Sequence, residues 1–171
     1  MIRAGIVTAS DTRSDGSAVD RATGPLRDEL ERRGVAVVEC LLVPDELDLI
    51  AAAIVRLVDE DGVDLVLTTG GTGLGPRDVT PEATRAVIER EVPGIAELLR
   101  IESARSTQHA WLSRGLAGTR GRALVVNLPG SPHGAVECAR VVLPLAGHAL
   151  AVLRGAGHDR PDDAPTKASP T

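Results

Sequence analysis

Apolar runs alternate with amphipathic segments along most of this chain, and this alternation limits the folds that it can form. Four runs predict buried strands, at residues 3–9, 35–43, 63–68 and 122–127. Each run is apolar along its length rather than at every second residue, so both of its faces are expected to be covered. The alternation predicts an α/β fold: a three-layer sandwich with a mainly parallel sheet covered by helices on both faces.

The intervening segments have the periodicity of helices. Helices are predicted over residues 20–33, 45–60, 81–91, 94–106, 135–142 and 145–154, the last two separated by Pro144. Residues 110–118 are expected to be a short strand or irregular. Residues 1–157 are expected to form one domain. Residues 158–171, rich in Asp, Pro, Ser and Thr, are expected to be a disordered tail.

The connection between the third strand and the helix at Pro81 carries the clearest chemical signal. Residues 70–75 contain four glycines, which let backbone N–H groups approach an anion. Around them lie polar side chains suited to a phosphorylated ligand, from Thr69, Thr72, Arg77 and Asp78. Thr80 is expected to cap the following helix, with Pro81 in its first position. Pro76 excludes both the dinucleotide-binding and the Walker glycine patterns. A flexible turn is the weaker interpretation, since a tight turn needs fewer glycines.

Polar residues follow the predicted strands at three further points. They are Ser10 and Asp11, then Asp45, and then Gly130 and Ser131. Ligands of open α/β sheets bind beyond the carboxyl ends of the strands, so these residues are expected to converge with residues 69–78 on one site. Taken singly, each has a simpler explanation. Asp45 and Ser131 would be helix N-caps, Asp78 a favourable charge at a helix start, and Ser10–Asp11 a surface loop.

Composition excludes several classes of function. The chain has no Phe or Tyr and one Trp, which argues against base-stacking platforms, and its net charge of −5 argues against a nucleic-acid coat. Lys167 is the only lysine, so lysine chemistry is excluded from the folded body. Cys40 and Cys138 fit a reduced cytoplasmic protein, and the histidines lack metal-ligand spacing. No uninterrupted apolar segment is expected to reach membrane-spanning length, and no membrane association is expected.

The residues at 68–73 and 77–83 resemble the signature of the molybdenum cofactor biosynthesis family of the MogA/MoaB type. Segments at 10–13, 43–46, 112–114 and 127–132 fit the same family in the same order. The resemblance covers residues 3–158. It implies an α/β sandwich that assembles as a homotrimer or hexamer. It also implies molybdopterin adenylyltransferase activity, in which the terminal phosphate of molybdopterin attacks the α-phosphate of Mg-ATP. The products would be pyrophosphate and adenylyl-molybdopterin, which passes to a MoeA-type molybdenum insertase.

The resemblance also implies roles for particular residues. Asp45 and Asp78 would be the catalytic acids and would hold Mg²⁺ and the attacking phosphate. The substrate- and nucleotide-binding residues would be Ser10, Asp11, Thr69, Gly70, Gly71, Thr72, Gly73, Gly75, Arg77, Gly130 and Ser131. His133 stands where relatives often carry Lys.

Two alternatives stay open at this point. One is a non-catalytic molybdopterin-binding protein of the MoaB type, which the short segment after His158 favours. The other is a nucleotide pyrophosphatase of the related competence-damage-inducible type.

Overall fold

A six-stranded sheet forms the middle layer of the molecule, with the strand order β2-β1-β3-β6-β5-β4. The computed structural model describes residues 1–156, so the predicted tail lies outside the described residues. The strands are β1 (Arg3–Ala9), β2 (Ala36–Val43), β3 (Leu65–Thr69), β4 (Arg90–Glu91), β5 (Ala117–Arg120) and β6 (Ala123–Leu128). Strands β2, β1, β3 and β6 are parallel, and β5 and β4 add an antiparallel edge. The mainly parallel sheet is therefore confirmed.

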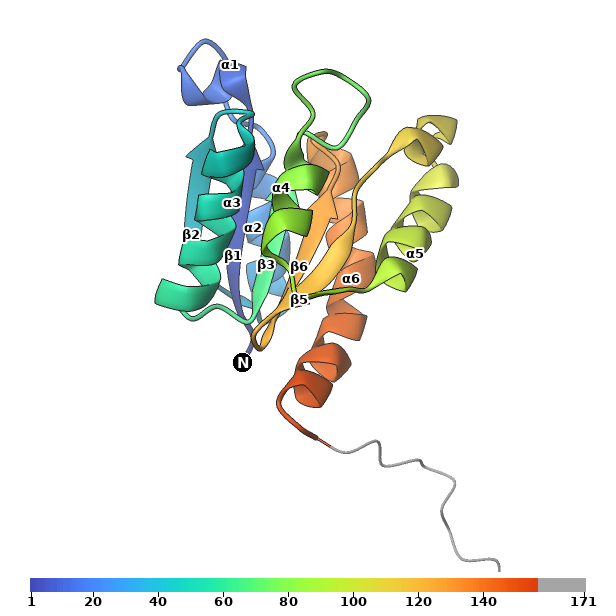
Figure 1. Cartoon of the computed structure of the whole chain (residues 1–171). Coiled ribbons are helices and arrows are strands. Elements are labelled where there is room, and N and C mark those ends of the chain that lie inside the picture. The colour runs from blue at the N-terminus through green and yellow to red at the C-terminus, as the bar shows by residue number, and fades with distance from the viewer. Residues whose placement is uncertain (157–171) are drawn as a thin grey trace, which may run out of the picture.

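Helices cover both faces of this sheet (Figure 1). Helices α2 (Thr23–Arg32), α5 (Pro93–Ala104) and α6 (Pro132–Leu153) pack on one face, and α3 (Leu47–Val55) and α4 (Thr80–Val87) pack on the other. Successive strand residues serve opposite cores: Ile6 joins the α2–α6 cluster, and Val7 joins the α3–α4 cluster. This two-sided burial explains why the strand sequences are apolar along their length.

Helix α6 is continuous, so the predicted break at Pro144 was wrong. A proline inside a helix removes one hydrogen bond and costs about 3 kcal/mol. Burial of Cys138, Val142 and Leu150 against the core, on both sides of Pro144, holds the helix together despite that cost. Among residues 1–156, α6 alone is long and apolar enough to cross a membrane, with a mean hydropathy of 1.6. Glu137 and Arg140 interrupt its apolar residues, so the expectation that no uninterrupted apolar run reaches about 20 residues is not contradicted, and α6 covers the sheet with one face.

Three connections differ from the prediction. The expected loop after β1 begins with one helical turn, α1 (Asp11–Ser14), and α3 is followed by a π-helical turn, η1 (Arg56–Glu60). The predicted helix at 81–91 ends at Val87, and Arg90–Glu91 pairs with β5 instead. The pairing is close because Gly118 has no side chain, and a Cβ there would lie 2.5 Å from the Ile88 Cδ1. Residues 110–118 span a 3₁₀ turn, η2 (Gln108–Leu112), and the start of β5.

Candidate functional site

The predicted polar loops lie together at the carboxyl ends of the parallel strands, at the edge of the sheet that carries α1 and the loop before α4 (Figure 1). We call residues 70–79 the glycine loop. Its base is tied to the loop after β6, because the Thr69 hydroxyl donates to the Pro129 carbonyl at 2.7 Å. A Cβ on Gly130 would lie 3.2 Å from the Gly70 Cα, so these two glycines are in contact. The Ser10 N–H donates to the Val43 carbonyl at 2.9 Å, which joins the ends of β1 and β2.

Asp11 and Asp45 form a reciprocal pair. The Asp11 N–H donates to Asp45 Oδ2, and the Asp45 N–H donates to Asp11 Oδ1, both at 2.9 Å. Arg77 approaches from the glycine loop and holds the Asp11 carboxylate with two bonds of 2.9 and 2.8 Å, from Nε and Nη2. These bonds from Arg77 lower the pKa of Asp11. Three loops that are distant in sequence are thus linked around Asp45.

Asp45 has the environment of a functional acid rather than that of a helix cap. Glu46 occupies the N-cap position of α3, so the N-cap interpretation of Asp45 was wrong. Burial raises the pKa of Asp45, and the negative charges of Asp11 and Asp78 raise it further. Asp45 Oδ1 is buried and has no hydrogen-bond partner among the described residues. An acid of this kind gains from a cation or a proton donor placed beside that oxygen.

Asp78 folds back onto its own loop. Its Oδ2 accepts the Gly75 N–H at 2.7 Å, and the Asp78 N–H donates to the Gly75 carbonyl at 3.0 Å. A Cβ at Gly73 or at Gly75 would lie 2.8 Å from Asp78 Oδ2, so neither position leaves room for a side chain. These two glycines therefore let the Asp78 carboxylate sit against the backbone of the loop. Asp78 also precedes α4 by two residues, so the helix-charge interpretation stands beside the functional one.

The backbone conformation at residues 70 and 71 requires glycine. Their φ angles are +94° and +63°, a region that side chains disfavour. A Cβ on Gly71 would lie 2.4 Å from Thr80 Oγ1 and 3.2 Å from Asp45 Oδ1, so the loop passes directly over both oxygens. Thr80 was predicted to be the N-cap of α4, and this prediction was wrong. Val79 holds that position, and the fully buried Thr80 hydroxyl has no partner among the described residues.

A cavity of about 460 Å³ borders the glycine loop at residues 72–74. It is lined by Thr72, Gly73 and Leu74, by Gly130 and Ser131, and by residues of α5, η2 and α6. Ser131 caps α6 as predicted, since its hydroxyl accepts the Gly134 N–H at 3.2 Å. His133 lies at the cavity and pairs with Glu137, with 3.1 Å between Nε2 and Oε1. The site thus has an acidic part and a cavity, and the glycine loop borders both.

Two further residues belong to this arrangement and were not among the predicted site residues. Arg114 contacts the glycine loop through its side chain and its backbone, and the Thr80 hydroxyl borders Asp45. Arg114 follows no predicted strand, and Thr80 has the sequence position of a helix cap. The one signal for either residue was the family resemblance, which covers residues 77–83 and 112–114 but implied no role for Thr80 or Arg114.

The donors at Asp45 fit Mg²⁺. Mg²⁺ prefers carboxylate and hydroxyl oxygens, and in nucleotide sites it is held by one or two carboxylates together with substrate phosphates. Asp45 Oδ1 and Thr80 Oγ1 are both buried and unpartnered, and Asp78 is near enough to raise the pKa of Asp45. Within residues 1–156 no group of three or more His, Cys, Asp or Glu side chains is arranged to hold a metal. These residues therefore suit an ion that arrives with a phosphate ligand.

Comparison with known proteins identifies relatives of this chain. The family described as "probable molybdopterin binding domain" matches residues 5–148. The molybdopterin adenylyltransferase of Helicobacter pylori is 38% identical over 156 residues, which cover 90% of this chain and 89% of that protein. The Drosophila melanogaster molybdenum cofactor synthesis protein cinnamon is 40% identical over 151 residues, and the chain spans 25% of its length.

A solved structure shows the same fold. The molybdopterin biosynthesis enzyme MoaB from Thermus thermophilus matches with a TM-score of 0.85 and 49% sequence identity, covering 91% of this chain and 98% of that one. The family match spans most of the chain, and both of its ends fall inside the described residues. The chain therefore belongs to the MogA/MoaB family of molybdenum cofactor biosynthesis proteins.

Proposed function

We propose that this protein is a molybdopterin adenylyltransferase, which joins the terminal phosphate of molybdopterin to the α-phosphate of ATP and releases pyrophosphate. The observation that carries the proposal is the position of Asp45 and Asp78 beside the glycine loop, with Asp45 Oδ1 buried and unpartnered. Relatives named molybdopterin adenylyltransferase, 38–40% identical to this chain, support the same activity.

The chain's own residues would act mainly by positioning the two phosphates. The backbone donors of the glycine loop and the N-terminus of α4 would hold phosphate oxygens. Arg77 would supply the nearby positive charge, since residues 1–156 contain no lysine. Mg²⁺, when bound with ATP, supplies neutralisation of the charge on the triphosphate, and Asp45 and Asp78 would hold it. Such in-line transfer needs no covalent intermediate with the protein.

The cavity would take the heterocyclic end of one substrate. Its volume of about 460 Å³ falls within the usual range of small-molecule sites. Its lining combines the apolar side chains of Leu74 and Leu112 with the hydroxyls of Thr72, Ser113 and Ser131. Because the glycine loop forms one wall of the cavity, a ligand bound there can place a phosphate against the loop.

We propose further that the protein works in the cytoplasm as a homotrimer or hexamer and delivers its product to a MoeA-type molybdenum insertase. Light scattering of the purified protein tests the assembly, and co-purification with the insertase tests the partner.

A non-catalytic molybdopterin-binding role is the second candidate. The engagement of Arg77 by Asp11 favours it, because that cation is then already occupied. In this case the same loop would bind ligand without turnover. The two candidates differ in one measurable quantity, pyrophosphate release.

The proposal is tested by substituting Asp78 and measuring pyrophosphate release with Mg-ATP and molybdopterin. Asp78→Ala is expected to lower the rate by about 100-fold or more, the usual effect of removing one preorganised electrostatic group, and to leave the fold intact. Asp48→Ala is the matched control, because Asp48 is an exposed acid in the first turn of α3 for which the described residues show no hydrogen bond or ion pair to the glycine loop. If both variants kept full activity, Asp78 would be no more than a charge at a helix start.

A further inference from the structure

The glycine loop has little to hold it in one shape. It contains no helix or strand, and four glycines in residues 70–75 make it costly in entropy to order. Within the loop, Asp78 bonds Gly75, and the Thr80 N–H donates to the Gly71 carbonyl at 3.0 Å. These contacts close the base of the loop, and the Asp78 carboxylate lies against Gly73, but among the described residues no hydrogen bond joins the two arms, residues 70–74 and 75–79, directly.

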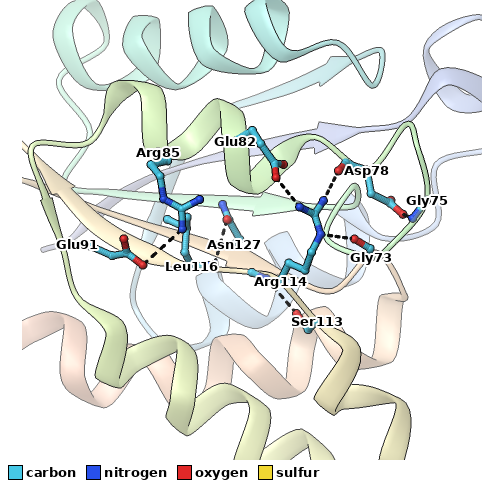
Figure 2. Close-up of polar contacts among 11 residues, drawn as sticks. Gly73, Gly75, Asp78, Glu82, Arg85, Glu91, Ser113, Arg114, Leu116 and Asn127 are labelled. Carbon is cyan, nitrogen blue, oxygen red and sulfur yellow. Dashed lines mark hydrogen bonds and ion pairs between the residues drawn. The ribbon is translucent and has the colours of Figure 1, made fainter.

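Arg114 makes the contacts that join the two arms (Figure 2). On the first arm, its backbone N–H donates to the Thr72 carbonyl at 2.9 Å, and its Nε donates to the Gly73 carbonyl at 2.6 Å. On the second arm, its Nη2 donates to the Asp78 carbonyl. Its Nη1 donates to Glu82 in the first turn of α4 and holds the pKa of that carboxyl below its ordinary value. One side chain thus fixes both arms to each other and to α4.

These bonds also decide where the loop's N–H groups point. A peptide bond is planar and trans, so the C=O of one residue and the N–H of the next point in opposite directions. Arg114 holds the carbonyls of Thr72 and Gly73, and the N–H groups of Gly73 and Leu74 therefore point away from it. Neither N–H donates to another group within the described residues. They are two donors available to an anion.

We infer that Arg114 is a positioning residue, which holds the Gly73 and Leu74 N–H groups and the Asp78 carboxylate in the geometry that binds a phosphorylated ligand. It acts through the loop, since its own guanidinium donors are already engaged by Gly73, Asp78 and Glu82. Only its effect on turnover rests on the proposed function; its effects on loop order and ligand affinity do not.

Arginine is required here because three acceptors in different directions are bound by one planar group. Guanidinium presents its donors in a rigid fork, whereas the lysine ammonium is a single point that cannot reach all three acceptors at once. Arg114→Lys should therefore behave like Arg114→Gln, although it keeps the charge. A purely electrostatic role would instead be rescued by lysine.

Arg120 provides a matched control. It lies on β5, and its guanidinium also contacts both a carboxylate and a carbonyl, those of Asp59 and Val87. Its side chain is about as exposed as that of Arg114, at 25% against 34%. Neither partner of Arg120 belongs to the glycine loop, so Arg120→Gln reproduces the loss of an ion pair without loosening the loop.

The test measures the affinity for Mg-ATP in the full chain and the hydrogen exchange of the Gly75 and Asp78 amides, both of which are hydrogen-bonded within the loop. Arg114→Lys and Arg114→Gln are expected to raise exchange in residues 72–79 and to weaken Mg-ATP binding by about 10- to 100-fold, as misplacement near a site does. Arg120→Gln should change neither quantity. Thermal melting identifies any variant that is simply unfolded.

Unchanged exchange and affinity in Arg114→Lys would overturn the inference, because lysine would then suffice. If the wild-type protein binds Mg-ATP but releases no pyrophosphate, the proposed function fails while the affinity ratio still decides the role of Arg114. If the wild-type protein binds no nucleotide, the hydrogen exchange of these two amides in the Arg114 variants decides the role of Arg114.

Discussion

Gly70→Ala should destabilise the domain far more than the same substitution at another glycine with positive φ. The Gly70 backbone has φ of +94°, and a Cβ there would lie 2.3 Å from the Ala9 carbonyl oxygen. That oxygen belongs to β1, a buried central strand, so the contact cannot be relieved by turning a side chain. Gly121→Ala is the reference, since Gly121 has φ of +53° and a Cβ there would touch nothing within 4 Å.

The two substitutions share every contribution to the free energy of unfolding except the steric clash of the new Cβ. Positive φ costs a residue with a side chain about 1–2 kcal/mol, and this applies to both sites. Overpacking against fixed structure adds about 1–3 kcal/mol at Gly70 alone. The unfolded chain loses the same freedom in both cases, so that term cancels. The expected loss of unfolding free energy is about 2–5 kcal/mol for Gly70→Ala and about 1–2 kcal/mol for Gly121→Ala.

Urea unfolding measures this difference. With a slope of about 2 kcal/mol per molar urea, the midpoint of Gly70→Ala should lie roughly 0.5–1.5 M below that of Gly121→Ala. Equal protein concentrations are needed, because assembly would make the midpoint concentration-dependent. Midpoints that agree within about 0.2 M would refute the reasoning, since the glycine loop would then not be seated against β1.

Two pH-dependent effects follow from the shifted pKa values of Asp45 and Glu29. The raised pKa of Asp45 means that its ionisation opposes folding, so stability from this group is present at low pH and is lost as pH rises through the folded pKa. Asp45→Asn should therefore increase the urea midpoint at pH 7, give no increase near pH 3, and still abolish pyrophosphate release. Arg140 and Arg33 lower the pKa of Glu29 to about 2, so stability from Glu29 is lost as pH falls from about 4.5. Unfolding curves of Glu29→Gln should lack that loss.

The sequence was sufficient for the layers and for the place of the site. Strand runs such as residues 63–68 are apolar along their length because alternate residues face two cores, and a single sequence carries that signal directly. The polar loops converge as predicted, since parallel strands end at one edge. The Ser131 cap was also predicted, because a cap depends on contacts within one helical turn.

The wrong predictions of secondary structure and capping arose where contacts between distant residues outweigh the local conformational preference of the sequence. Pro144 would end an isolated helix, but burial of α6 on the sheet sustains it. Thr80 has the sequence of a cap, yet the glycine loop crosses over it and Val79 takes that position. Arg90 and Glu91 continue a helical pattern, yet they pair with β5 across Gly118. Contacts between residues so far apart have no periodicity that a single sequence could reveal.

The contacts of Arg114 are the clearest case of this kind. Its guanidinium reaches Gly73 and Asp78, which lie 41 and 36 residues earlier in the chain. No local pattern around residue 114 indicates that pairing, whereas the glycine-loop residues that it holds were all predicted. The sequence thus pointed to the loop residues that we propose for the ligand site, and it missed the residue that holds their backbone.

The most direct test of the proposed activity omits each substrate in turn. Purified protein with Mg-ATP and molybdopterin should release pyrophosphate and form an equal amount of adenylyl-molybdopterin, and should release none when either substrate is left out. Tight binding of molybdopterin with no pyrophosphate release would contradict the account and establish a binding protein instead.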